Sequence, residues 1–318
     1  MKKFELTTEF ITNALGKKLF RIKALVEFGS VKAGELGGYA EKEENISQDG
    51  NAWVFGNAEV YGNAWVSDDA KVSGDAKVFG NACVYGDAKV FGNAEVYGNA
   101  EVYGNAEVYG NAWVSGDACV YGDAKVFGNA EVYGNAEVYG DAKVYGNAWV
   151  SGDACVYGDA KVSGNAKVFG NAKVYGDAEV SGNAKVFGNA EVYGNAWVSG
   201  NAKVSGNAWV YDNAWVSDNA EVCGDAWVSG NARVYGDAWV SGDADYALVQ
   251  GFGTEFRCTT FYRGKNKKIM VNCGCFHGDL EGFRKQVKET RNGKIAKEYL
   301  MIADLMEYHF TSEDSSNE

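Results

Sequence analysis

The chain has 318 residues, a net charge of −13, 42 glycines, no proline and 14% aromatic residues. So many aromatic residues exclude a disordered linker and favour a packed chain. The acidic excess lies in the middle, where 24 acidic residues stand against 11 basic ones, whereas residues 1–50 and 245–318 are each balanced. This distribution argues against a nucleic-acid partner.

Runs of about 18 apolar residues, which a membrane helix requires, are missing from the sequence. The first residues, MKKFELTTEF, lack the apolar core of a secretory signal. The seven cysteines are odd in number and scattered, which fits reduced thiols better than disulfides. We therefore expect a cytoplasmic protein with no membrane partner.

Residues 1–50 predict an N-terminal β cap, with short strands at residues 2–7 and 17–29. A six-residue register begins to emerge within them, because Gly38, Ala40, Asn45 and Ile46 fall in phase with the repeat that follows. The glycine-rich segment GELGGY, residues 34–39, lacks the lysine and the spacing of a phosphate-binding loop.

From Ala52 to Ala244 an alanine recurs every six residues, 33 times, and from Val54 to Val240 a valine recurs 32 times. The unit is G-[N/D]-A-x-V-y, and an aspartate replaces the glycine only at Asp68, Asp212 and Asp218. Alternation along a short strand predicts that Ala and Val face inward and that x and y face outward. Gly followed by Asn or Asp suits a tight bend, so the repeat predicts a coil of stacked turns.

This unit resembles the hexapeptide repeat of left-handed parallel β-helix proteins, in which three hexapeptides make one triangular turn of 18 residues. The resemblance covers residues 51–245 and implies an all-β solenoid of about 11 turns stacked at ~4.8 Å. The segment GELGGYAEKEENISQDGNAWV, residues 34–54, resembles the YdcK-like group of bacterial and prophage hexapeptide proteins. That group implies a left-handed β-helix assigned to the transferases without a defined reaction.

An 18-residue turn places every third unit on one outward face. Tyrosine then occupies position y on eight consecutive turns of one face, which we expect to form a single column: Tyr85, Tyr103, Tyr121, Tyr139, Tyr157, Tyr175, Tyr193 and Tyr211. The same face carries Cys83, Cys119 and Cys155 at x, two turns apart. A second face carries lysines that each follow an aspartate by two residues: Lys71, Lys89, Lys125, Lys143 and Lys161 after Asp69, Asp87, Asp123, Asp141 and Asp159.

Residues 246–310 predict a small α+β module. Residues 254–264 and 267–276 favour a hairpin. A first helix is expected to begin at the N-cap Asp279 and to stop at Gly293. A second amphipathic helix covers residues 294–310, with an apolar stripe of Tyr299, Leu300, Ile302, Leu305 and Met306. Residues 311–318 predict a flexible acidic tail.

The sequence offers few candidate catalytic residues. β-Helix acyltransferases and carbonic anhydrases use histidines, whereas this coil holds none, and His277 and His309 both follow it. We therefore assign no catalytic residue and no cofactor. One candidate metal site remains, because Cys273, Cys275 and His277 alternate along an expected strand beside Cys258, and such side chains can bind zinc. Core cysteines beside a surface histidine are the alternative.

The aromatic surface carries the functional prediction, since tyrosine and tryptophan are enriched in interfaces. We expect a non-catalytic, rigid, phage- or prophage-encoded scaffold that binds itself, a trimer being favoured by the resemblance, or binds another protein. The alternatives are a protein that sequesters a small molecule, nucleotide signal or glycan on its aromatic surface, and an enzyme like the hexapeptide acyltransferases.

Overall fold

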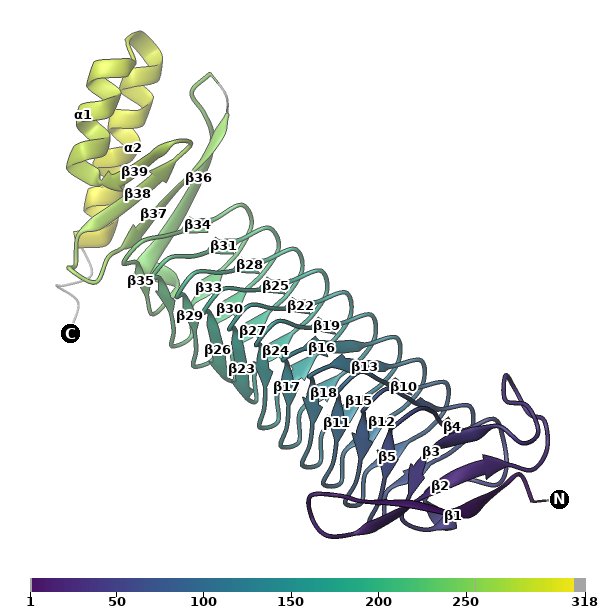
Figure 1. Ribbon diagram of the computed structural model, residues 1–318. Helices are drawn as coiled ribbons and strands as arrows, with labels where there is room; N and C mark the ends of the chain where they lie inside the picture. The colour runs from purple at the N-terminus through teal and green to yellow at the C-terminus, as the bar shows by residue number, and fades with distance from the viewer. Residues whose placement is uncertain (1, 255, 312–318) are drawn as a thin grey trace. The chain divides into compact units, whose positions relative to one another are not determined.

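The computed structural model describes residues 2–254 and 256–311, except the side chain of Arg257. The chain divides into two compact units, Met1–Asn171 and Ala172–Glu318. Each unit contains turns of a parallel β-solenoid (Figure 1). Within a unit, strands pair with strands 18 residues away, as Glu95 with Trp113 and Val96 with Val114. The prediction of a solenoid with 18-residue turns is therefore confirmed, while the left-handed sense of the coil stays a prediction.

The first unit begins with three strands that cover the open edge of its first turn (Figure 1). Strand β1 (Phe4–Thr12) pairs antiparallel with β2 (Lys18–Ala24), and β2 pairs antiparallel with β3 (Leu36–Ala40). Strand β3 then pairs parallel with β5 (Glu59–Val60). A 3₁₀ turn, η1 (Glu43–Asn45), follows β3. A β-rich N-terminal segment is thus present, as the sequence predicts.

The predicted register of this segment is wrong by two residues. Ala40 pairs with Val60 and Ile46 bridges to Val66, so both lie in the valine column and not in the alanine column. The chain from Ile46 to Trp53 is two residues longer than the corresponding step of a repeat. The longer corner is held by the buried Lys3, whose Nζ donates to the carbonyls of Asp49 (3.2 Å), Gly50 (3.4 Å) and Ala52 (3.1 Å).

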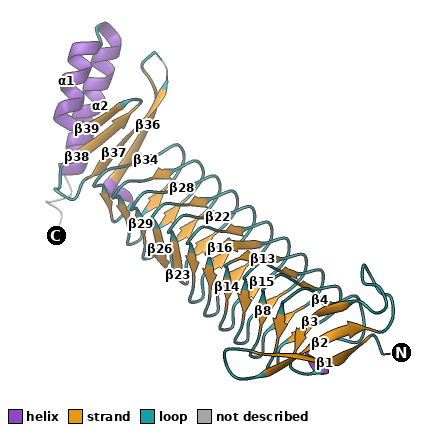
Figure 2. Cartoon of the chain, in the orientation of Figure 1, coloured by secondary structure: helices purple, strands orange, loops and turns teal. Residues whose placement is uncertain are grey.

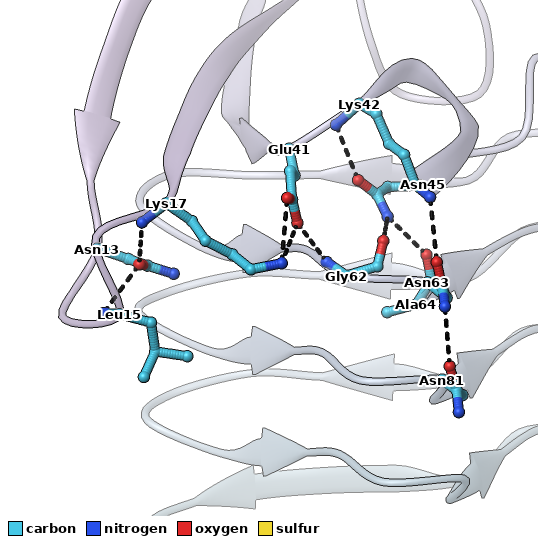
Figure 3. A network of polar contacts seen from close by, with 10 residues as sticks. All are labelled: Asn13, Leu15, Lys17, Glu41, Lys42, Asn45, Gly62, Asn63, Ala64 and Asn81. Atoms are coloured by element: carbon cyan, nitrogen blue, oxygen red, sulfur yellow. Dashed lines mark hydrogen bonds and ion pairs between the residues drawn. The ribbon is translucent and has the colours of Figure 1, made fainter.

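Side chains from this segment also satisfy backbone groups of the first turns (Figure 3). The Asn45 amide donates to the carbonyls of Gly62 at 3.1 Å and Ala64 at 2.8 Å. The Glu41 carboxylate accepts from the Gly62 N–H and from the Lys17 ammonium. Burial opposes ionisation of Glu41, yet these hydrogen bonds hold the pKa of its carboxyl below the usual range.

The remaining strands of the first unit are short and fall on three faces of the coil. The first face holds β5, β8 (Lys77–Val78), β11 (Glu95–Val96), β14 (Trp113–Val114), β17 (Glu131–Val132), β20 (Trp149–Val150) and β23 (Lys167–Gly170). The second holds β6 (Trp65–Val66), β9 (Cys83–Val84), β12 (Glu101–Val102), β15 (Cys119–Val120), β18 (Glu137–Val138) and β21 (Cys155–Val156). The third holds β4 (Trp53–Val54), β7 (Lys71–Val72), β10 (Lys89–Val90), β13 (Glu107–Gly110), β16 (Lys125–Gly128), β19 (Lys143–Val144) and β22 (Lys161–Val162).

The second unit continues the same pattern on its own three faces. The first holds β26 (Lys185–Gly188), β29 (Lys203–Val204), β32 (Glu221–Val222) and β35 (Trp239–Val240). The second holds β24 (Lys173–Val174), β27 (Glu191–Val192), β30 (Trp209–Val210) and β33 (Trp227–Val228). The third holds β25 (Glu179–Val180), β28 (Trp197–Val198), β31 (Trp215–Val216) and β34 (Arg233–Val234).

Up to three backbone hydrogen bonds connect each hexapeptide with the next turn. In one example, the N–H groups of Asn93, Glu95 and Tyr97 donate to carbonyls one turn on, at 2.7, 3.0 and 3.0 Å. The alanines from Ala52 to Ala238 and the valines from Val54 to Val240 are almost completely buried, as predicted, and fill the interior of the coil. Trp53, at an outward position, is also fully buried, because Phe4 and Phe28 of the N-terminal segment pack on its ring.

Two structural features explain why the repeat contains a glycine. Gly98 has φ +75°, in the left-handed region that glycine tolerates, and a Cβ there would lie 2.9 Å from the Gly116 nitrogen one turn away. Three aspartates adopt the same conformation with φ of 55–59°, and each accepts a hydrogen bond from the N–H one turn on: Asp68, Asp212 and Asp218.

The second unit ends in a four-stranded antiparallel sheet with helices packed against it (Figure 2). The strands are β36 (Tyr246–Phe252), β37 (Arg257–Arg263), β38 (Ile269–Cys273) and β39 (Phe276–Asp279), after the 3₁₀ turn η2 (Asp243–Asp245). The helices are α1 (Leu280–Thr290) and α2 (Gly293–Thr311). The hairpin of β37 and β38 is confirmed, whereas strands β36 and β39 are not predicted by the sequence.

Two details of the helices differ from expectation. Asp279 caps α1 as predicted, accepting from the Gly282 N–H at 2.9 Å, but α1 ends at Thr290, and Gly293 begins α2 with φ +60°. Leu305 is 58% exposed, while Ala303 and Phe310 are buried instead, because the contact stripe follows Tyr299, Ile302 and Met306. The predicted tail beyond Thr311 lies outside the described residues, and the predicted domain limits stay a prediction.

The C-terminal sheet closes the last turn of the second unit with hydrogen bonds. The Arg233 N–H donates to Thr260 Oγ1 at 3.0 Å, and the Tyr262 hydroxyl donates to the Tyr235 carbonyl at 3.2 Å. The Lys265 N–H donates to the Asp237 carbonyl at 2.9 Å. The backbone edge of β34 and its neighbouring corner is thus covered, which removes a template for adding further strands.

We expect Gly98→Ala to lower the melting temperature clearly more than Gly16→Ala does. Both glycines have φ near +75°, so both substitutions carry the left-handed strain, about 1–2 kcal/mol. The Gly16 position has open space around an added Cβ, whereas Gly98 meets the next turn's backbone, which adds about 1–3 kcal/mol. Thermal unfolding followed by circular dichroism measures the difference, and equal shifts would contradict the close contact between turns.

Candidate interaction surface

The outward tyrosines of β9, β12, β15, β18 and β21 form one stacked column in the first unit. Successive ring centroids from Tyr85 to Tyr157 lie 4.8–4.9 Å apart, with interplanar angles of 1–4°. The predicted column is therefore confirmed for these residues. We call the outward surface of these five strands the tyrosine face; it consists of Tyr85, Tyr103, Tyr121, Tyr139 and Tyr157 with Cys83, Glu101, Cys119, Glu137 and Cys155.

A second column runs through the second unit on the corresponding strands. Tyr175, Tyr193 and Tyr211 stack at 4.8 and 5.0 Å. The prediction that these three tyrosines share a face is confirmed within that unit. The column ends at Tyr211, because the next turn carries Ser229 at the same position.

Stacking decides which part of each tyrosine reaches solvent. Rings within a column are covered on both faces by their neighbours, so they present edges and hydroxyl groups. A sugar ring or nucleobase that stacks on an aromatic residue needs a free ring face. The middle of a column therefore does not favour such a ligand, and free faces occur where a column ends.

Glutamates one turn on accept hydrogen bonds from alternate tyrosines. The Tyr85 hydroxyl donates to Glu101 at 2.9 Å, and the Tyr121 hydroxyl donates to Glu137 at 3.0 Å. Burial, followed by these hydrogen bonds, raises the pKa of both phenols above the usual value. Sequence analysis missed these two glutamates, although the alternation of Cys and Glu at position x was a visible signal.

Two cysteines of the tyrosine face, Cys83 and Cys119, lie in surroundings that lower the reactivity of their thiols. Burial, and then the neighbouring Glu101 carboxylate, raise the pKa of the Cys83 and Cys119 thiols. Both thiols donate to the backbone carbonyl two residues earlier, at 3.7 and 3.8 Å. A raised pKa lowers the thiolate fraction at neutral pH, so these side chains act as small neutral surface groups.

The predicted lysine and aspartate columns also lie on one face, the third face of the first unit. All of them except Lys161 line a groove of about 750 Å³. Lys89 and Lys125 pair with Glu107, at 3.0 and 3.2 Å, and not with the aspartates two residues before them. The two lysines hold the pKa of the Glu107 carboxyl below its usual range. The groove thus has mixed charge, which does not favour a simple anion site.

The candidate metal residues do not share one strand as the sequence predicts. The chain turns between Cys273 and Phe276, where Gly274 has φ +62°, so Cys275 is exposed in the turn and His277 pairs with Asn272 across the hairpin. The Cys258 thiol donates instead to the Asn231 carbonyl at 3.4 Å. Within residues 2–254 and 256–311, no three His, Cys, Asp or Glu side chains gather as metal ligands.

The comparisons with known proteins bear on the coil alone. Residues 226–242 match the YdcK beta solenoid repeat. This match spans just under one turn, in the second unit, and names the same YdcK group that residues 34–54 resemble. No curated protein matches the chain. Among the described residues, no helix combines the length and apolar character that crossing a membrane requires.

We expect Glu107→Gln to lower stability by less than about 1 kcal/mol at pH 7, the range of exposed ion pairs. The pKa of Glu107 is depressed in the folded state, so the contribution is present above the unfolded pKa of about 4.3 and is lost as pH falls through the folded pKa. Denaturant unfolding at pH 7 and at pH 3 measures this difference. Glu131→Gln is the control, since Glu131 has no ion pair among the described residues, and equal effects at both pH values would contradict the pairing.

We expect iodoacetamide at pH 7.5 to alkylate Cys275 at least about tenfold faster than Cys83 or Cys119. Cys275 is exposed, whereas the pKa of each of the other two thiols is raised by burial and by Glu101. Peptide mass spectrometry of timed samples gives the three rates. In denaturant the rates should converge; rapid labelling of Cys83 in the folded protein would contradict the environment described.

Proposed function

We propose that the chain is a non-catalytic solenoid scaffold that associates side by side with further copies of itself through the tyrosine face. The observation that carries this proposal is a flat column of half-buried tyrosines on the least charged outward face of the first unit. Free cysteines in an acidic chain also suit a reducing cytoplasm.

Charge distinguishes the three faces of the first unit. Position x of the tyrosine face carries only two charged residues, Glu101 and Glu137, both of which accept hydrogen bonds from tyrosines. The other two faces are heavily charged at x, with Glu59, Lys77, Glu95, Glu131 and Lys167 on the first face and Lys71, Lys89, Glu107, Lys125, Lys143 and Lys161 on the third. Interface centres are depleted in charge and enriched in tyrosine, which supports the tyrosine face as the contact.

The covered ends of the coil favour lateral contact over end-to-end growth. In the first unit, β1–β3 and Lys3 cover the edge of the first turns, and in the second unit β37 covers β34. Sheet edges that are covered cannot add strands from another copy. We therefore place self-association on the outward faces of the coil, where the trimer implied by the hexapeptide resemblance is one closed arrangement.

The residues of the tyrosine face support a second copy of the chain as its partner. A tyrosine hydroxyl lies on every turn of this face and a glutamate carboxylate on every second turn, so a facing copy can offer donors to acceptors. The Tyr103 hydroxyl has no hydrogen-bond partner among the described residues, and its ring stacks between Tyr85 and Tyr121. Tyr103 therefore lies at a position suited to an interface centre.

We expect the wild-type protein to exceed its 34.2 kDa monomer mass at tens of micromolar in light scattering, and Tyr103→Arg to return it toward the monomer. Loss of a central tyrosine weakens an interface by about 2 kcal/mol or more, a factor of about 30 in Kd. The matched control is Tyr109→Arg, because Tyr109 stacks between Phe91 and Phe127 on the third face. A monomeric wild-type protein, or equal effects of both substitutions, would contradict the proposal.

A further inference from the structure

The tyrosine column of the second unit ends at an unfilled position. Tyr193 covers one face of Tyr211, with ring centroids 5.0 Å apart. One turn further on, Ser229 occupies the position that a tyrosine would fill if the column continued, since Val210 pairs with Val228. The serine side chain is too small to cover the second face of Tyr211.

A pocket of about 320 Å³ lies at this end of the column. Its lining comes from the last turns of the coil and from the start of β36: Tyr211, Trp227, Ser229, Asp243, Tyr246, Ala247 and Leu248. Three of these residues are aromatic and one is a carboxylate, and the lining contains neither lysine nor arginine. A small site lined by aromatic rings and one carboxylate therefore lies at the end of the stacked rings.

Two of the aromatic rings stand at a steep angle to each other. Tyr193 and Trp209 are inclined by 74°. Tyr211 lies within 6° of the plane of Tyr193, and Trp227 lies within 3° of the plane of Trp209. Tyr211 and Trp227 therefore form two steeply inclined aromatic sides of the pocket, and Trp227 is 46% exposed.

Elsewhere the chain places its own cations over tryptophans, in each case from the x position one turn further on. The Lys167 ammonium lies 3.8 Å from the ring centroid of Trp149, and the Arg233 guanidinium lies 5.8 Å from that of Trp215. Strand β33, which carries Trp227, is the last strand of its face. Among the residues that the structure describes, no cation lies over Trp227 or Tyr211.

One oxygen of the Asp243 carboxylate in the pocket accepts a hydrogen bond from the backbone. Asp243 Oδ1 accepts from the backbone N–H of Trp227 at 3.0 Å, which holds the carboxylate at the start of β33. Within the described part of the chain, Oδ2 has no hydrogen-bond partner. The residue one turn beyond Trp227 is Asp245, and it pairs with Arg263 at 2.9 Å, so it brings no cation to the pocket.

We propose that this pocket binds the methylated ammonium group of a small organic cation. Ring faces of tryptophan and tyrosine attract such cations, and the attraction grows when the cation is desolvated. A methylated ammonium suits these surfaces better than a primary ammonium, because it needs few hydrogen bonds and the pocket supplies one carboxylate. This site lies in the second unit and is independent of the tyrosine face.

Choline and its uncharged isostere 3,3-dimethylbutan-1-ol are the probes, added to the full chain and followed by tryptophan fluorescence and by calorimetry. We expect choline to bind with a millimolar or tighter Kd and the isostere to bind at least about tenfold more weakly, since they differ in charge but hardly in shape. No binding of choline at 20 mM, or equal binding of the two probes, would overturn the proposal.

Two substitutions locate the site. Ser229→Tyr extends the column into the pocket and should abolish choline binding while leaving the fold intact. Ser205→Tyr is the control, because Ser205 follows Phe187 by one turn on another face, and it should bind choline as the wild type does. Asp243→Asn keeps an acceptor for the Trp227 N–H and should weaken choline binding at least fivefold. Unchanged binding in Ser229→Tyr or in Asp243→Asn would overturn the proposed site.

Discussion

Backbone hydrogen bonds between successive turns set the structure of this chain. Hexapeptides donate up to three N–H groups to carbonyls one turn on, so a residue lies directly beside the residue 18 positions away. Side chains of one type therefore form columns at the strand spacing, about 4.8 Å. Alanine and valine columns fill the interior, glycine columns allow the turns to approach, and the outward columns determine the surface.

The same constraint explains why outward residues contact their neighbours on the turns before and after them. A tyrosine covers the faces of the tyrosines before and after it, a glutamate one turn on accepts from its hydroxyl, and a lysine or arginine one turn on covers a tryptophan. Chemistry that differs from this regular pattern arises where a column stops. Ser229, next to Tyr211, is such a place, and it leaves both a ring face and space.

The positions of residues could be predicted from the sequence wherever the six-residue repeat continues without insertions. The column from Tyr85 to Tyr157 followed from counting, because nothing interrupts the phase there. Ala40 and Ile46 were placed in the wrong column, because the corner before Trp53 holds two extra residues that periodicity alone cannot locate. The hydrogen bond from Tyr85 to Glu101 spans 16 residues, not 18, and so escaped a search for columns. Cys273 and His277 looked like one strand because alternation continues through the tight turn at Gly274.

The 18-residue turn also bears on how such a gene can change length. Duplication or loss of 18 codons within the uninterrupted repeat adds or removes one whole turn, and every column on both sides keeps its partners. Duplication of a single hexapeptide after Cys155 instead moves all later residues to the next face, so the cysteines and glutamates at position x of the tyrosine face would be followed by lysines along one column. Selection that preserves the surface therefore allows the length of the coil to change only in steps of one whole turn.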